Sequence, residues 1–282
     1  MGDKPRTRSV RPLVVVSDLH VGCGLAVMPP GGFTDDEGNH RNPGRLQRKL
    51  GAWWDEFWKW VEVETQGDYD VCVNGDLIDG MHHENTTHWT ANMDTQRQAC
   101  VQLLRPVRER AQRFLVVRGT ETHTGKSGQH EEAIARELNA EKSREGTCSH
   151  WELYYRMGRY LVHLTHHIGT TSSPFAESGA LNREMVSGYV QSGRSGKTAP
   201  DVYVRSHRHT CAVFSHPSER DDDPIRMSTS ISTPSWQLKT PYLHRTAARM
   251  QQPQIGGVLI IAGHNTVYAK PWTRFIERPG EV

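Results

Sequence analysis

The sequence places acidic and imidazole side chains where apolar segments end. Asp18-Leu19-His20 directly follows one such segment, at 11–17, and Asp76 follows another, at 69–74. In an extended chain, residues two apart point to the same side, so Asp18 and His20 can converge on one ion. If both segments are parallel strands, their carboxyl ends meet where open α/β sheets bind ligands. Two carboxylates brought together there repel each other unless a cation lies between them, so the pattern predicts a metal site.

The remaining candidate ligands are mostly histidines. His166 and His167 close an apolar segment, and His207 and His209 close another, again with two imidazoles two residues apart. Mixed imidazole and carboxylate ligands suit Mn, Fe, Zn, Ni or Co better than Mg or Ca. Each residue taken alone could simply cap a turn or be a hydrogen-bonded core imidazole. Their shared position at the ends of apolar segments favours one metal site.

The segments between these motifs predict the elements that position them. Segments 11–17, 69–74 and 113–118 are β-rich, and helical spacing of apolar residues at 45–64 and 95–111 separates them. This alternation indicates an α/β core with parallel strands. The second half predicts helices at 129–141 and 173–191 and strands at 151–156, 160–165, 202–205, 210–215, 225–232, 257–262 and 266–271. Without a clear linker or repeat, we expect a single domain over residues 1–282.

Composition narrows the class of protein. Of 282 residues, 35% are hydrophobic and 23% charged, which is typical of a globular chain. A formal net charge of +2 argues neither for nor against a nucleic-acid partner. The five cysteines are scattered and predict reduced thiols rather than a disulfide framework. The first apolar stretch, Leu13–Val16, is too short for a signal peptide or a membrane span, so we expect a cytoplasmic protein without a membrane partner.

The order of the motifs resembles that of the calcineurin-like metallophosphoesterase superfamily. The resemblance spans about two thirds of the chain and rests on these matches: Asp18-Leu19-His20, Gly75-Asp76, an altered third motif after Gly119, His166, and Ser206-His207-Arg208-His209. It implies an α/β fold, a four-layer αββα sandwich of two mixed sheets flanked by helices. It also implies two divalent transition-metal ions, with Mn the first expectation and Fe, Zn, Ni or Co as alternatives.

The resemblance also assigns ligands. Asp18, His20, Asp76 and His209 would hold one ion, and Asp76 would bridge to a second ion. The second ion would be held by His166 and His207. His167 rivals His166 because the two histidines are adjacent.

The third motif departs from the family pattern. Thr120 and Glu121 stand where the family has an Asn ligand followed by His. In one interpretation Glu121, or less readily Thr120, supplies the missing ligand, and His123 is displaced by a short insertion and still acts as general acid. In the other, the second metal site is weak and activity has been lost. The first is favoured because an imidazole remains in the same loop.

These residues predict phosphoester hydrolysis. Two metals about 3.5–4 Å apart can clamp a phosphoryl group and activate water, and His123 would protonate the leaving oxygen. Arg208 and Lys126 are the nearest cations in sequence and candidates for binding the phosphate; Arg208 could equally face solvent. We expect a phosphodiesterase or nuclease acting on nucleotides or nucleic acid, with a phosphomonoesterase (phosphatase) second. The rival from another class is a non-catalytic scaffold.

Other motifs have simpler explanations. Residues 119–127 resemble a P-loop but have five residues, not four, before the Gly-Lys pair. Residues 263–266 begin Gly-His but lack the final His, and they fit a hairpin turn between two strands. The aromatic residues of 53–60 lie mostly at helical spacing, which favours core packing over base stacking. Three histidines after the Asp76 loop either line the substrate side of the site or form a lid: His82, His83 and His88.

Overall fold

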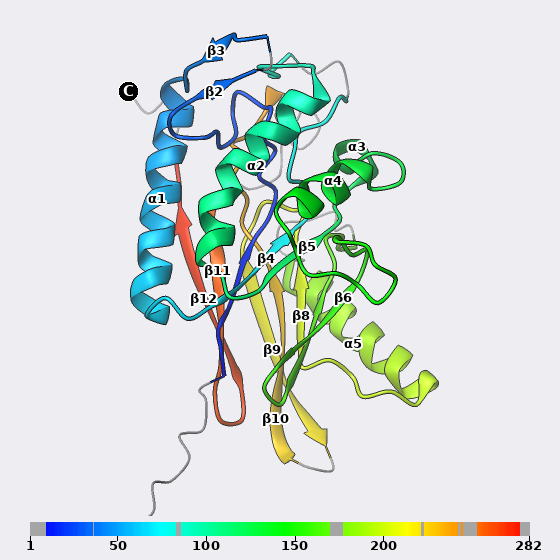
Figure 1. The fold of residues 1–282 in the computed structure, drawn as a ribbon. Helices are drawn as coiled ribbons and strands as arrows, with labels where there is room; N and C mark the ends of the chain where they lie inside the picture. Colours follow the sequence, from blue (N-terminus) through cyan, green and yellow to red (C-terminus); the bar gives the residue numbers. More distant parts are fainter. Residues whose placement is uncertain are drawn as a thin grey trace, which may run out of the picture.

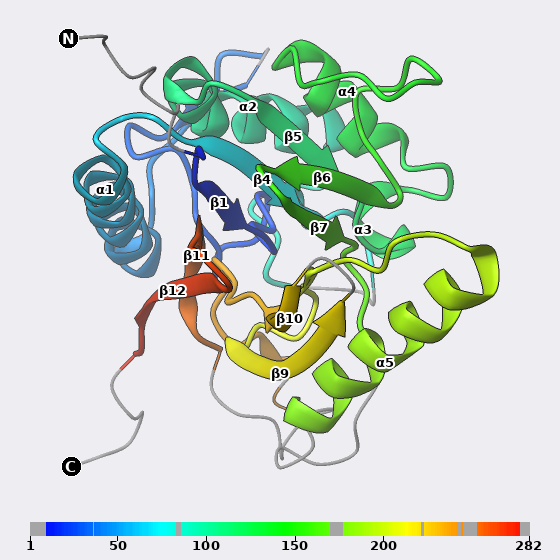
Figure 2. The same ribbon diagram turned by 90° about the horizontal axis from the view of Figure 1, so that it is seen from below.

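The computed structural model describes residues 10–35, 37–82, 86–169, 177–220, 223–241, 244 and 253–276. Two five-stranded sheets stack face to face, and helices cover both outer faces (Figure 1, Figure 2). The predicted α/β architecture of two mixed sheets flanked by helices is therefore confirmed. Among the described residues, no helix combines the length and apolar character that crossing a bilayer requires.

The first sheet has the order β12-β11-β1-β4-β5. Its centre consists of the parallel strands β1 (Leu13–Val16), β4 (Asp70–Asn74) and β5 (Phe114–Val117). The hairpin of β11 (Ile255–Ala262) and β12 (Val267–Arg274) adds to β1 in antiparallel fashion. The carboxyl ends of the three parallel strands therefore lie at one edge, as the sequence predicted.

The second sheet has the order β6-β7-β8-β10-β9. Strands β7 (Tyr160–Leu164), β8 (Val202–Arg205) and β10 (Asp223–Ser232) run parallel. The outer strands β6 (Leu153–Met157) and β9 (Ala212–Arg220) are antiparallel to their neighbours. The segments that follow β7 and β8 carry the second set of candidate ligands.

Helices complete the four layers. The first sheet is covered by α1 (Arg45–Thr65), α2 (Met93–Arg110) and α4 (Gln129–Glu137), and the second by α5 (Glu177–Ser195) (Figure 2). A single turn, α3 (Glu121–Thr124), follows β5. The predicted helix at 173–191 begins in residues outside the described ones, so only its part from Glu177 can be compared.

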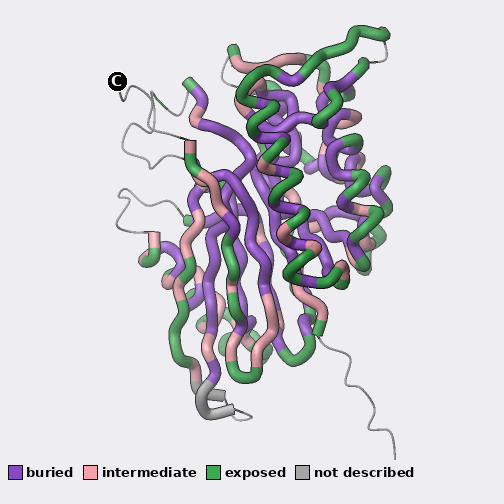
Figure 3. Tube along the Cα trace, turned by 90° about the vertical axis from the view of Figure 1, so that its left-hand side faces the viewer, coloured by how far each residue is buried: buried purple, intermediate pink, exposed green. Residues whose placement is uncertain are grey.

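The strands are buried on both faces, which explains their apolar sequences. In β1, Leu13 and Val15 face the core between the sheets, whereas Val14 and Val16 face the core beneath the helices. Figure 3 shows the buried trace running along the strands, with exposed residues on the outer turns of the helices. The aromatic residues of α1 pack into the helix-covered core, as expected: Trp54, Phe57 and Trp58 are buried there.

Two small features were not predicted. The loop after β1 contains a hairpin of β2 (Phe33–Thr34) and β3 (His40–Arg41), and two-residue strands leave no periodic signal. The turn α3 likewise is too short to show helical spacing. The hairpin turn predicted at 263–266 is confirmed, because Ala262 pairs with Val267 across it. All five cysteines are free, as expected.

Candidate metal centre

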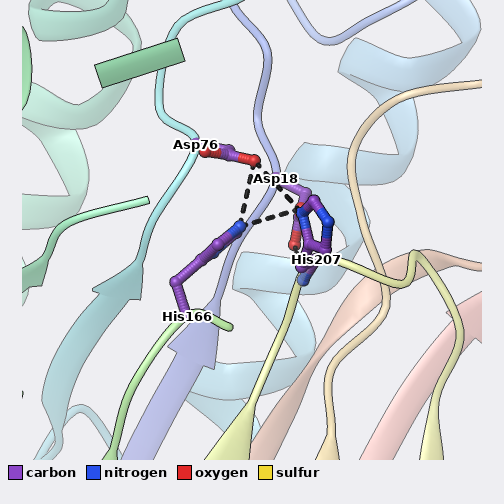
Figure 4. A group of neighbouring side chains, drawn as sticks. All are labelled: Asp18, Asp76, His166 and His207. Carbon is purple, nitrogen blue, oxygen red and sulfur yellow. Dashed lines mark hydrogen bonds and ion pairs between the residues drawn. The ribbon is translucent and has the colours of Figure 1, made fainter. Parts of the chain in front are cut away.

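The carboxyl ends of strands from both sheets bring the candidate ligands into one place. Asp18, Asp76, His166 and His207 present ligand atoms within 4.8 Å of one another (Figure 4). Asp18 also belongs to a second group, with His20 and His209, whose ligand atoms lie within the same distance of one another. The structure thus brings together six of the residues that the sequence singled out.

The backbone at the site is unusual. Asp18, His20, Asp76, His207 and His209 all have positive φ, between 44° and 72°. Only two other described non-glycine residues do so. Each such residue costs on the order of 1 kcal/mol, and such strain concentrates at functional sites.

This backbone corrects one step of the sequence argument. Asp18 and His20 were expected to share a side because the chain would be extended, but β1 ends at Val16 and both residues are left-handed. His207 and His209 follow β8 in the same way. The pairs converge because tight turns fold the chain back at the strand ends, not because the strands continue.

Two glycines allow the loops that follow β4, β5 and β7 to pack closely against one another. A Cβ atom at Gly119 would lie 2.1 Å from Asp76 Oδ1, and one at Gly75 would lie 2.4 Å from His166 Nδ1. No side chain fits at either position. The Asp76 loop can therefore contact both the β5 loop and His166 directly.

His166 is fixed as a ligand-ready imidazole. Its Nδ1 lies 2.7 Å from the Asn74 carbonyl oxygen, so Nδ1–H donates there and Nε2 faces the carboxylates. Nε2 lies 3.0 Å from Asp76 Oδ2 and 3.9 Å from Asp18 Oδ1. His167, in contrast, is exposed and belongs to neither ligand group. The structure therefore places His166, rather than its neighbour, among the candidate ligands.

Buried polar atoms in this group fit a cation. Asp18 Oδ1 and His166 Nε2 are both buried, and neither has a hydrogen bond of good geometry to a described residue, although Nε2 lies beside the Asp76 carboxylate. Burial alone would lower the pKa of His166, but the charges of Asp76 and Asp18 raise it to about 10. Without metal, Nε2 of His166 therefore holds a proton between the two carboxylates. A divalent ion can replace that proton and bind the lone pair of Nε2.

The second group also brings imidazole nitrogens close to the Asp18 carboxylate. His209 Nε2 lies 3.3 Å from Asp18 Oδ1, and His20 Nε2 lies 3.9 Å from the same oxygen. The two Nε2 atoms are 3.3 Å apart. On its other side, His20 Nδ1 lies 3.3 Å from Asp79 Oδ1, which orients the ring as supporting carboxylates do for metal-bound histidines. Asp79 was not predicted as part of the site.

Glu131 of α4 holds the two loops in position and was not anticipated from the sequence. This fully buried carboxylate accepts hydrogen bonds from Leu77 N at 3.0 Å and Gly119 N at 2.6 Å. Burial and the nearby Asp76 charge raise the pKa of Glu131 to about 7. A Glu in an amphipathic helix is normally expected on the solvent-exposed face, so the sequence did not distinguish Glu131 from an ordinary surface residue.

The altered third motif places Thr120, but not Glu121, beside the candidate ligands. Thr120 donates its backbone N–H to Asp76 Oδ1 at 2.7 Å, and its hydroxyl lies 3.0 Å from the same oxygen. Glu121 is exposed at the start of α3 and is in none of the ligand groups. The structure thus does not bring Glu121 to the other ligands, because the helical turn directs it outward.

His123 does face the centre. Its Nδ1 lies 2.5 Å from the Asp79 carbonyl oxygen, and its Nε2 lies 4.0 Å from Asp76 Oδ2. Burial lowers the pKa of His123 to about 4. With Nδ1–H donated to the carbonyl, Nε2 is the atom available for proton transfer.

The two predicted phosphate-binding cations have different surroundings. Arg208 forms an ion pair with Glu177 at 2.8 Å and its side chain is only 10% exposed, so it does not simply face solvent. Lys126 is exposed and lines a cleft of about 680 Å³ beside α3. The same cleft is lined by Met81, His82 and Glu121.

The chain was compared with protein families, curated proteins and solved structures. No family model matches the chain, and no curated protein does. Solved structures that are similar to it include the following three. Vacuolar Protein Sorting 29 from Cryptosporidium parvum is 10% identical, with a TM-score of 0.40, over 95% of this chain and 100% of that one.

Two further structures show similarity of the same degree. The Thermotoga maritima protein TM1076 is 11% identical, with a TM-score of 0.36, over 94% of this chain and 100% of that one. The Thermus thermophilus sulfate thiohydrolase SoxB is 12% identical, with a TM-score of 0.39, over 97% of this chain and 58% of that one. At this level of similarity we draw no functional conclusion from the three structures.

Proposed function

We propose that this protein is a metal-dependent phosphoester hydrolase with a dinuclear centre. The observation that carries the proposal is the pair of ligand groups that share Asp18, in which the buried atoms Asp18 Oδ1 and His166 Nε2 lack a well-formed hydrogen bond. One ion would be held by Asp18, His20 and His209. The other would be held by Asp76, His166 and His207, with Asp18 in reach of both groups.

The donor set suits borderline transition metals, with Mn as our first choice. When bound, two such ions clamp a phosphoryl group and activate water for attack on phosphorus. The chain supplies the remaining chemistry. Glu131 and Thr120 keep the Asp76 loop in place. His123 directs Nε2 towards the centre, and because burial lowers the pKa of His123, this nitrogen must take up a proton before it can donate one to the leaving oxygen.

Within this class we propose a phosphodiester substrate, such as a nucleotide or a nucleic-acid strand. The cleft beside α3 adjoins the His123 turn and has the volume of a typical small-molecule site. Met81 and Met93 supply apolar lining, and Lys126 supplies a positive charge for a phosphate-bearing group, opposed by the negative charge of Glu121 in the same cleft. A phosphomonoester is the second choice, because the same centre could cleave it without using the whole cleft.

The test is a substrate panel on protein that has been stripped of metal and reloaded with Mn. Bis-p-nitrophenyl phosphate, p-nitrophenyl phosphate and single-stranded DNA are offered in turn. We expect turnover of the diester to exceed that of the monoester and to vanish in Asp76→Ala and His209→Ala. His264→Ala is the matched control, since His264 also follows a glycine at a strand end but is exposed, in the β11–β12 turn. Monoester turnover alone would replace the diester assignment by the phosphatase one.

The non-catalytic scaffold is supported by one observation. Thr120 stands where the resemblance expects an amide ligand, and Glu121 does not take its place. A hydroxyl is a weaker ligand for these metals than an amide oxygen or carboxylate. Full metal occupancy without turnover of any of the three substrates would establish the scaffold over the hydrolase.

A further inference from the structure

A second concentration of ligand atoms lies beside the proposed dinuclear centre, in the segment that follows Asp76. Asp79 is fully buried, and its two oxygens face two histidines of the same segment. His82 Nε2 lies 3.5 Å from Asp79 Oδ1, and His88 Nε2 lies 2.8 Å from Asp79 Oδ2. The ligand atoms of these three residues lie within 4.8 Å of one another.

We propose that Asp79, His82 and His88 bind a third divalent transition-metal ion. Two imidazoles and one carboxylate are a ligand set that binds Zn, Co or Mn with a further position left for water. Both imidazoles are largely sheltered, with side chains 13% and 9% exposed, so a bound ion would be shielded on the protein side. The site does not depend on the proposed function, because none of its three residues belongs to the dinuclear ligand set.

The geometry favours an ion over a simple hydrogen-bonded cluster. Hydrogen bonds would require only that each imidazole nitrogen approach one carboxylate oxygen. Here the two imidazole nitrogens also lie close to each other, and the rings stand nearly perpendicular, with centroids 5.7 Å apart. Three ligand atoms that lie within 4.8 Å of one another can close on a single ion with small side-chain adjustments.

His20 connects the third site to the dinuclear centre. Its Nδ1 faces Asp79 Oδ1 at 3.3 Å, while its Nε2 faces Asp18 and His209. His82 also packs edge-on against His123, with ring centroids 4.7 Å apart. An ion on Asp79 would therefore place positive charge near the turn that carries the proposed general acid.

The shared position of Asp79 decides the design of the test. A change at Asp79 would disturb His20 and hence the dinuclear centre, whereas His82 and His88 belong to neither of the two ligand groups proposed for that centre. We therefore compare the wild type with His82→Ala/His88→Ala and with His166→Ala/His207→Ala. His216→Ala/His264→Ala, two exposed histidines outside the site, is the matched control.

The measurement is equilibrium dialysis of the stripped proteins against Zn²⁺, with the bound metal counted by mass spectrometry. We expect His82→Ala/His88→Ala to bind one equivalent fewer than the wild type, and the control to bind the same number. The affinity lost at that equivalent should exceed about 100-fold, since loss of outer-shell partners alone costs up to that much. With Co²⁺, the visible absorption of one ion should disappear in the same variant.

The outcomes separate this site from the proposed function. If the dinuclear centre does not bind metal, the wild type should still bind one ion that is lost in His82→Ala/His88→Ala and kept in His166→Ala/His207→Ala. Equal stoichiometry in the wild type and His82→Ala/His88→Ala would overturn the third site, whatever the activity. If the double variant does not fold, His88→Gln alone answers the question, because it removes the closest imidazole while preserving side-chain bulk.

Discussion

Buried carboxylates occur at both ends of the parallel strands, but in different company. At the amino ends, Asp70 contacts the Arg11 guanidinium and accepts a hydrogen bond from the Tyr155 hydroxyl. Asp201, which precedes β8, accepts from Leu161 N at 2.7 Å and lies 3.1 Å from Arg226 Nε. Guanidinium groups keep their charge at every physiological pH, so these carboxylates have permanent counter-charges.

At the carboxyl ends, the partners of the carboxylates are imidazoles. Asp18 lies near His20, His166 and His209, and Asp76 lies near His166. An imidazole can give up its proton and present a lone pair, which a guanidinium cannot do. The comparison shows that equally buried carboxylates can have two roles. At the amino ends their charge is balanced by guanidinium groups, which stabilises the fold. At the carboxyl ends their imidazole partners can make room for a cation.

The largest effect is expected at Asp76. Asp76→Asn keeps the side-chain shape but removes the charge of a proposed metal ligand, so kcat/KM for the diester should fall by at least about 10³-fold. Steady-state kinetics at saturating Mn measure this. The metal-free variant should lose less stability in urea than Asp201→Asn does. Activity within tenfold of the wild type would break the comparison.

The opposite result is expected at the amino end. Asp201→Asn removes the carboxylate that Arg226 contacts, and both side chains are at most 4% exposed. Breaking a buried ion pair in this way should lower the free energy of unfolding by about 3 kcal/mol. Urea denaturation of the metal-free protein measures the loss. The kcat of the folded fraction should not change, and a fall in kcat there would erase the distinction between the two ends.

Much of this arrangement was predictable from the sequence, for a physical reason. Strands buried on both faces must be apolar throughout, so β1, β4 and β5 were recognisable as short apolar runs. Polar residues directly after such runs must lie at the sheet edge. For that reason Asp18 and Asp76 could be placed in one pocket before any coordinates were known.

The details that escaped prediction depend on contacts between distant segments. Glu131 ties Leu77 to Gly119, although its own sequence context is an ordinary helix. Asp79 was not predicted at the site, because its contact with His20 forms only when the two loops are folded. Glu121 was expected at the centre, yet the turn of α3, too short to leave a pattern, directs it away.

Metal removal gives the next effect in size. At a free Mn²⁺ concentration 100 times the dissociation constant, binding to the folded state alone adds about 2.7 kcal/mol to stability. Thermal unfolding of wild type and Asp201→Asn should therefore shift upward by a similar free energy when Mn²⁺ is restored after EDTA treatment. Asp76→Asn should show a much smaller shift. An equal shift in all three proteins would mean that the ions bind elsewhere.

The smallest effect is expected at Glu132, and it extends the comparison to two adjacent carboxylates of one helix. Glu131 and Glu132 are neighbours in α4, but Glu132 faces away from the site and accepts hydrogen bonds from Cys148 N and Ser149 N. Burial would raise the pKa of Glu132, but these donors, the Ser149 hydroxyl and Arg136 lower it to about 2. Its folded-state pKa thus lies below the unfolded value near 4.5. Its contribution to stability is therefore complete above pH 4.5 and declines as pH falls towards 2.

Glu132→Gln should consequently lower the free energy of unfolding by about 2 kcal/mol at pH 7, since the side chain is 15% exposed and partly screened. The difference from the wild type should shrink between pH 4.5 and pH 2, as measured by urea denaturation across that range. Glu137→Gln is the control, because its pair with Arg105 is exposed and should contribute less than about 1 kcal/mol. A difference for Glu132→Gln that stays constant with pH would show that the carboxylate charge is not what holds the Cys148–Ser149 segment, because a shape effect alone does not titrate.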